Sequence, residues 1–121
     1  MALRYFTDSE FAECNPPCNK DDLSQIFLEL LDSARHLSGV PFILTSGFRS
    51  KIYEIEQGRD GSSSHTKGLA VDIKADNSVT RFKIINALIS VGFNRIGIGK
   101  DFIHVDMDKA KPEKVLWHYY G

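Results

Sequence analysis

The stretch "SSSHTKGLAVDIKA" (residues 62–75) decides the fold and raises the first question about chemistry. Its second half is a short apolar run with the character of a β-strand, and Asp72 interrupts that run. Burying an unpaired carboxylate is costly, so Asp72 needs a partner: an arginine such as Arg49 or Arg95, a helix N-terminus, or a metal ion. His65, in the Ser- and Gly-rich loop before the strand, is the first residue that points to a metal.

A second run, "FIHVDM" (residues 102–107), is interrupted in the same way. Side chains alternate along a strand, so His104 and Asp106 share one face while the apolar residues between them face the core. If this strand neighbours the first, Asp72 and His104 converge, and His65 reaches them from the loop. Two imidazoles and one carboxylate form a three-ligand zinc set with an open fourth position, which is typical of a catalytic site.

The remaining pattern predicts a single α+β domain over residues 1–121, in which a small antiparallel sheet carries the zinc site and helices pack around it. Helices are expected over 22–37, with acidic residues at the start and Gly39 at the end, over 51–57, and over 79–91 with Ser78 as N-cap. The last helix should bury Phe82, Ile85, Leu88 and Ile89. Strands are expected at 41–46, 70–75, 95–99 and 102–107, the last two as a tight hairpin.

Composition excludes several functions. A net charge of -1 with 26% charged residues gives no basic surface for nucleic acid. No apolar stretch approaches the length that spans a membrane, so no membrane insertion is expected. The N-terminus lacks the apolar core of a Sec signal peptide, which predicts a cytoplasmic protein as synthesised. Cys14 and Cys18, in "CNPPC", lack a second Cys/His pair at zinc spacing and are expected to be free thiols. A monomer is favoured.

Three segments together resemble the signatures of the M15 zinc peptidases, which include D-Ala-D-Ala carboxypeptidases and phage endolysin peptidases. These segments are "SGFRS" (46–50), "SSHTKGLAVDI" (63–73) and "FIHVD" (102–106). The family pattern is S-x-H, six residues, D, and then an acidic residue three before a second histidine. Here it reads Ser63, His65, Asp72, Asp101 and His104. The resemblance implies the hedgehog and D,D-peptidase-like fold.

The resemblance also implies roles for individual residues. His65, Asp72 and His104 would hold one Zn²⁺ per chain, and Asp101 would be the general base. On a straight strand Asp101 would face away from His104, so a turn must lie between them. Asp101 is otherwise a hairpin-turn aspartate, and Asp106 is then the alternative acid, although a role in orienting an imidazole suits Asp106 better.

Four further residues are candidates for substrate contact. Arg49 would bind a substrate carboxylate or the oxyanion; its alternative is a structural salt bridge. Ser63 would hydrogen-bond substrate or simply hold its loop. Trp117 and Tyr119 would line the rim of the cleft or seal the last strand.

The function that the resemblance implies is zinc-dependent hydrolysis of peptidoglycan stem or cross-link peptides, by an endolysin-like endopeptidase or a D,D-carboxypeptidase. A phage or prophage setting is expected, with action on the cell wall after release from the cytoplasm. The alternative is a non-catalytic zinc-binding module of the same fold, as in hedgehog domains, with a structural or partner-binding role. Retention of a candidate base and of Arg49 favours the enzyme.

Overall fold

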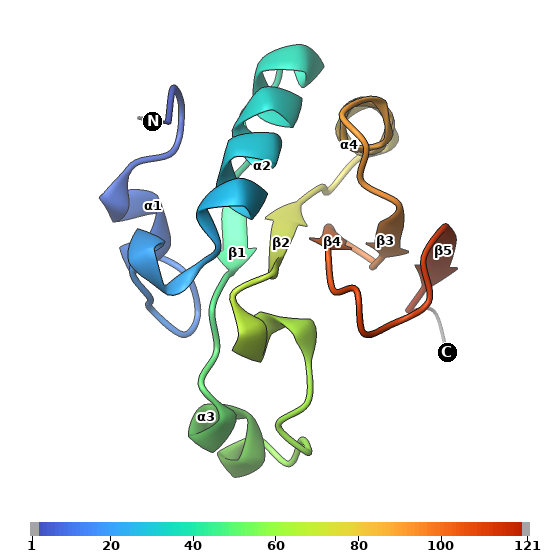
Figure 1. Ribbon diagram of the computed structural model, residues 1–121. Helices are drawn as coiled ribbons and strands as arrows, with labels where there is room; N and C mark the ends of the chain where they lie inside the picture. The colour runs from blue at the N-terminus through green and yellow to red at the C-terminus, as the bar shows by residue number, and fades with distance from the viewer. Residues whose placement is uncertain (1–2, 120–121) are drawn as a thin grey trace.

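The order of helices and strands confirms the α+β class. The computed structural model describes residues 3–119, and Figure 1 shows the arrangement of its elements. The helices are α1 (Asp8–Ala12), α2 (Gln25–Ser38), α3 (Lys51–Glu56) and α4 (Ser78–Ser90), with the 3₁₀ helices η1 (Lys20–Asp22) and η2 (Ser64–Lys67). The strands are β1 (Leu44–Ser46), β2 (Ala70–Lys74), β3 (Arg95–Ile98), β4 (Phe102–Asp106) and β5 (Val115–His118).

The strands form one mixed sheet in the order β1-β2-β4-β3-β5. The pairs β1–β2, β2–β4 and β3–β4 are antiparallel, as expected, and β3 and β4 form the expected hairpin. The expectation of a purely antiparallel sheet is wrong in one respect, because β5, which was not foreseen, pairs with β3 in parallel. After β4 the chain turns back and passes to the far edge of β3. Strand β5 is therefore antiparallel to β4 in direction and parallel to β3.

The hydrophobic core lies between one face of the sheet and the two long helices, α2 and α4, which pack against each other. Val71 and Ile73 of β2 and Ile103 and Val105 of β4 point into this layer and are fully buried. Because side chains alternate along a strand, the residues between them project from the opposite face. The candidate ligands on β2 and β4 are therefore presented on the face away from the helices.

Helix α2 starts later than the periodicity indicates. The acidic residues Asp21 and Asp22 form η1, and Ser24 caps α2 by accepting a hydrogen bond from the Phe27 amide at 3.3 Å. Gly39 ends the helix in the left-handed conformation, as expected. No helix within residues 3–119 is long and apolar enough to cross a membrane.

Helix α4 is rotated relative to the prediction. Its N-cap is Asn77, whose side chain accepts from the Thr80 amide at 2.9 Å, and not Ser78. The helix buries Ile84, Ala87 and Leu88, whereas two residues expected in the core are largely exposed: Phe82 at 70% and Ile89 at 56%. The prediction holds for Leu88, which is fully buried, and for Ile85, which packs partly buried against the core. Because the helix is apolar on more than one side, periodicity selected the buried stripe only in part.

Gly68 fixes the segment between η2 and β2 against the start of α2. Its φ of +70° is in the left-handed region, and a Cβ at this position would lie 2.4 Å from the carbonyl oxygen of Asp22. The Gly68 carbonyl accepts a hydrogen bond from the Ser24 amide at 2.8 Å. Only glycine allows this close contact, which holds η2, and His65 with it, in a fixed place.

Cys14 and Cys18 are free and buried, which confirms the expectation of free thiols. Both sulfur atoms lie against Gly47, the residue after β1. A Cβ at position 47 would lie 3.1 Å from Cys18 Sγ and 3.8 Å from Cys14 Sγ. The two thiols therefore form a wall directly behind the backbone at Gly47.

Candidate metal centre

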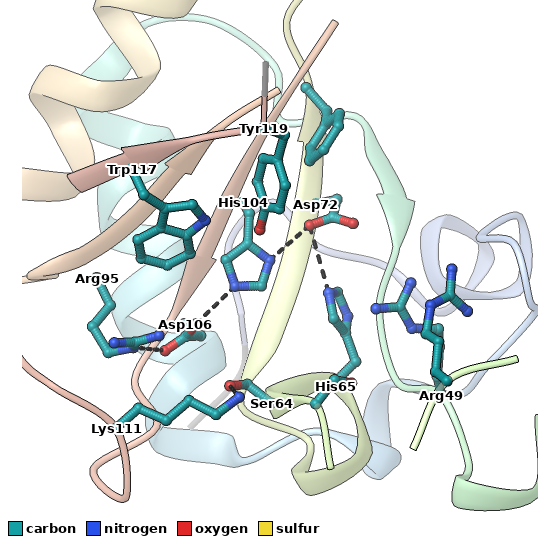
Figure 2. Close-up of a pocket in the computed structure, with 13 residues that line it drawn as sticks. Arg49, Ser64, His65, Asp72, Arg95, His104, Asp106, Lys111, Trp117 and Tyr119 are labelled. Atoms are coloured by element: carbon teal, nitrogen blue, oxygen red, sulfur yellow. Dashed lines mark hydrogen bonds and ion pairs between the residues drawn. The ribbon is translucent and has the colours of Figure 1, made fainter. Parts of the chain in front are cut away.

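The pairing of β2 with β4 brings the two strand-borne candidate ligands together. Asp72 lies directly opposite His104 in the antiparallel register. His104 Nδ1 lies 2.9 Å from Asp72 Oδ1, and Figure 2 shows the two side chains pointing toward each other over the sheet. Asp72 therefore has neither Arg49 nor Arg95 as its partner, but the two histidines. Of the alternatives for Asp72, this contact favours a metal site.

The other nitrogen of His104 is held by a buried carboxylate. His104 Nε2 lies 2.7 Å from Asp106 Oδ2, and Asp106 Oδ1 in turn accepts from Arg95 Nε at 2.6 Å. Arg95 also donates to the Pro112 carbonyl and stacks over Trp117, with its Cζ 5.0 Å from the ring centroid. This chain of contacts sets the imidazole so that Nε2 carries its hydrogen toward Asp106 and Nδ1 faces Asp72.

His65 completes the cluster from η2. Its Nδ1 lies 2.7 Å from the Gly47 carbonyl oxygen, which can only accept, so Nδ1 carries the hydrogen. The free nitrogen is then Nε2, which lies 3.5 Å from Asp72 Oδ1. The Arg49 amide donates to the His65 carbonyl at 3.2 Å and ties η2 to the segment after β1 a second time.

The donor set fits a divalent cation. One donor atom from each of His65, Asp72 and His104 lies within 4.8 Å of the other two. Each imidazole is fixed through its other nitrogen by an oxygen acceptor, which is how proteins orient metal-binding histidines. Two nitrogens and one carboxylate suit zinc and leave room for a further ligand. These residues are the ones that would hold the metal.

Protonation in the cluster follows from its charges. Burial alone would raise the pKa of Asp72, but hydrogen bonds from His104 and His65 outweigh it and hold that pKa well below its usual value. Burial would lower the pKa of His104, yet the two flanking carboxylates, Asp106 and Asp72, raise it overall. Asp106 also has a lowered pKa, because His104 and Arg95 overcome its burial. Both carboxylates therefore stay ionised at neutral pH.

The cluster opens into a pocket of about 340 Å³. The pocket is lined by the three candidate ligands, by basic side chains from several loops, and by the aromatic residues Phe102, Trp117 and Tyr119. Arg49 belongs to this lining and is also in an ion pair. Its Nε lies 2.9 Å from a carboxylate oxygen of Glu54 on α3, and the Glu54 side chain is completely buried. Both interpretations of Arg49 are thus compatible with its position.

Two other predicted site residues lie in different surroundings. Ser63 lines the pocket, and its hydroxyl is buried without a hydrogen-bond partner within residues 3–119. Asp101 lies in the β3–β4 turn with its side chain exposed and outside the pocket lining. Its carbonyl accepts from the Ala75 amide at 2.8 Å, which fixes the turn against the end of β2. The structure thus brings Ser63 to the metal cluster but leaves Asp101 apart from it.

The unforeseen strand β5 supplies an aromatic wall. Trp117 packs against His104 with ring centroids 5.6 Å apart, and Tyr119 packs against Phe102 at 5.3 Å. In Figure 2 the Tyr119 hydroxyl points toward His104 and Asp72. Partial burial raises the pKa of Tyr119. Its phenol therefore keeps its proton and can donate a hydrogen bond in the pocket. Tyr119 was expected at the rim of the cleft, whereas its role as a donor was not foreseen.

A His/Asp/His set at the base of an open pocket, presented by a small α+β fold, is the arrangement of a metal-dependent hydrolase. A family model described as Peptidase M15 matches residues 4–106, and the chain therefore belongs to this peptidase family. Membership indicates a metallopeptidase whose substrate is a peptide. A search of curated proteins found no match to the chain.

Proposed function

We propose that the protein is a zinc peptidase that hydrolyses peptidoglycan stem or cross-link peptides, as an endopeptidase or a D,D-carboxypeptidase. The observation that carries the proposal is the convergence of His65, Asp72 and His104 within 4.8 Å, with the non-binding nitrogen of each histidine already engaged. The choice of peptidoglycan rests on the likeness of the sequence motifs to D-Ala-D-Ala carboxypeptidases and endolysins. A phage or prophage setting and action after release belong to the same proposal.

When bound, zinc would supply the Lewis acidity that activates water and polarises a peptide carbonyl. The side chains of the chain do the rest. Arg49 is placed to bind a substrate carboxylate or the developing oxyanion, and the Tyr119 phenol can donate to the same oxygen. The unpaired Ser63 hydroxyl is available to a polar group of the peptide. Trp117 covers His104 and limits the access of bulk water.

The general base is the open part of the mechanism, and Asp101 is our candidate. Asp106 lies nearer to His104, but its two oxygens are engaged by His104 and Arg95 and the side chain is buried. An acid committed to two partners is poorly available to move a proton. Asp101 has no such partner among residues 3–119, and the adjacent Phe102 lines the pocket. A role as base requires its carboxylate to turn toward that pocket.

The alternative is a zinc-binding module without catalysis, serving a structural or partner-binding role. One observation favours it: within residues 3–119, the carboxylates that line the pocket are Asp72 and Asp106, and both are engaged by the histidines. Such a module would bind zinc as tightly as the enzyme but would hydrolyse nothing.

One experiment separates the two functions. Purified peptidoglycan is incubated with zinc-loaded protein, with EDTA-treated protein, and with EDTA-treated protein to which zinc is returned. The products are identified by mass spectrometry, which names the cleaved bond. The enzyme releases muropeptides only in the two zinc-containing samples. Stoichiometric zinc with intact peptidoglycan in all three would reject the peptidase and support the module.

A further inference from the structure

The pocket contains more positive charge than its metal-binding carboxylate can balance. Four basic residues line it: Arg49, Arg59, Arg95 and Lys111. Two of the four are neutralised by buried carboxylates, since Arg49 faces Glu54 at 2.9 Å and Arg95 faces Asp106 at 2.6 Å. Arg59 and Lys111 remain to be explained.

Lys111 comes from the loop between β4 and β5 and reaches back toward η2. Its Nζ donates to Ser64 Oγ at 3.1 Å, next to the candidate ligand His65, as Figure 2 shows. The nearest ion pair is long, at 3.7 Å from Asp108 Oδ2. Asp108 is already held by Lys67, whose Nζ lies 2.9 Å from both of its oxygens. The Asp108 carboxylate is thus shared by two lysines, and its ion pair with Lys111 is weaker than its ion pair with Lys67.

Arg59 comes from the opposite side, from the loop between α3 and η2. Its amide bonds to the Glu54 carbonyl at 2.8 Å, which fixes the backbone. Its guanidinium makes no ion pair or hydrogen bond with any residue from 3 to 119, and the side chain is exposed while it lines the pocket. The neighbouring carboxylate, Asp60, is engaged by Ser62 at 2.6 Å and 3.0 Å.

Charges around this side of the pocket therefore do not cancel. Three cations, Arg59, Lys67 and Lys111, face two carboxylates, Asp60 and Asp108. The cluster of His65, Asp72 and His104 with a divalent cation adds a further positive charge. An unpaired guanidinium and a partly paired ammonium that line the same pocket are suited to a carboxylate, which a guanidinium binds through two parallel hydrogen bonds.

We propose that Arg59 and Lys111 form an anion subsite that binds a free carboxylate on the substrate residue flanking the cleaved peptide bond. This inference rests on the proposed function and narrows its substrate class to acidic peptides. A glutamate joined through its side chain, as in peptidoglycan, keeps its α-carboxylate free beside the peptide backbone. Conversion of that carboxylate to the amide changes its charge but hardly its shape.

The test uses a pair of stem peptides, L-Ala-γ-D-Glu-L-Lys with the glutamate α-carboxylate either free or amidated. For the zinc-loaded protein, kcat/KM should be roughly 10- to 100-fold higher for the acid, the usual worth of a hydrogen bond to a charged group. Arg59→Gln and Lys111→Gln should each remove most of this preference by slowing cleavage of the acid, with cleavage of the amide unchanged. Lys83→Gln is the matched control, because Lys83 is exposed on α4 outside the pocket.

Two results would overturn the subsite. One is a wild-type protein that cleaves acid and amide equally well; the other is a loss in Arg59→Gln and Lys111→Gln that is the same for both peptides. Cleavage of neither peptide would exclude an endopeptidase that cuts beside the glutamate, and would leave the D,D-carboxypeptidase activity of the proposed function untouched. In that event calorimetric titration of the two peptides into zinc-loaded protein tests the subsite alone. Equal Kd values for the acid and the amide would reject it.

Discussion

His104 stands between two carboxylates, with Nδ1 2.9 Å from Asp72 on the neighbouring strand and Nε2 2.7 Å from Asp106 on its own strand. The two contacts divide the imidazole into a metal-binding side and an anchored side. The strand register alone produces the first contact, and strand alternation produces the second. Two of the three candidate ligands are therefore placed by the sheet, and the third, His65, is held by η2 through its contact with the Gly47 carbonyl, which favours a preorganised site.

Zinc stoichiometry tests the ligand assignment. The protein should bind about one Zn²⁺ per chain, and His65→Ala or His104→Ala should lose most of it, because two remaining donors bind zinc poorly. Metal content is measured by mass spectrometry after dialysis. His36→Ala is the control, since His36 contacts Tyr5 and Arg4 instead of the cluster. Full zinc content in both ligand variants would refute the assignment.

Paired substitutions distinguish a base from a ligand. Asp101→Asn keeps its shape but cannot accept a proton, so zinc content should be retained while kcat falls roughly 10²–10⁴-fold. Asp72→Asn removes the anionic ligand, so zinc affinity falls and activity recovers in part at high zinc concentration. Both are followed by steady-state kinetics over a range of zinc concentrations. An active, zinc-replete Asp101→Asn protein would eliminate Asp101 and leave Asp106 to be tested.

Asp106 should position His104 without binding the metal itself. Asp106→Asn is expected to weaken zinc binding roughly 10- to 100-fold, as loss of such supporting carboxylates does. Competition with a coloured chelator measures this affinity. Stability should also fall, because Arg95 is left buried without its anion. Glu10→Gln, which breaks the partly buried pair with Arg35 at 2.8 Å, controls for the loss of an ion pair elsewhere. Lower stability with unchanged zinc affinity would contradict the positioning role.

Asp108 should make stability depend on pH in acid. Burial opposes its ionisation, but hydrogen bonds from Lys67 and Ser64 hold its pKa at about 2, below the ordinary 3.8. A depressed pKa in the folded state contributes stability that is complete above about 3.8 and is lost as pH falls toward 2.

The measurement compares urea unfolding of metal-free wild type and Asp108→Asn from pH 6 to pH 2. The variant should be less stable at pH 6, and the difference should disappear near pH 2. Asp76→Asn, which removes an exposed carboxylate, provides the baseline. A difference that stays constant over the whole range would show that the charge of Asp108 is unimportant.

Local patterns were sufficient to predict that Asp72 and His104 converge, and that His65 can join them. Alternation in "FIHVDM" correctly placed His104 and Asp106 on one face, and an aspartate inside an apolar strand correctly signalled a charged partner. The chemistry of the donors then limited the choice of partner. These inferences succeeded because they depend on neighbours along one strand and on a single pairing between two strands.

Contacts between distant segments were not predictable in this way. The sequence offered Arg49 and Arg95 as partners of Asp72, whereas the fold pairs them with Glu54 and Asp106. Any of these carboxylates would satisfy an arginine, so only the tertiary arrangement decides. A similar ambiguity affected α4. Apolar residues occur on more than one side of this helix, so the sequence gave no reliable choice between Ile84 and Phe82 as the buried side chain. Strand β5 was missed because the sequence pattern of residues 115–118 does not reveal that they pair in parallel with β3.

Gly47 connects the thiol pair to the metal centre, and this contact has a consequence for the family's evolution. Its carbonyl orients His65, while a Cβ in its place would lie 3.1 Å from Cys18 Sγ. A Cβ at position 47 would make a tight contact with Cys18 Sγ, which must move by a few tenths of an ångström, and a smaller side chain at position 18 relieves this contact without displacing the carbonyl. Positions 47 and 18 should therefore covary among relatives that keep the histidine, with glycine opposite cysteine and alanine opposite a residue smaller than cysteine.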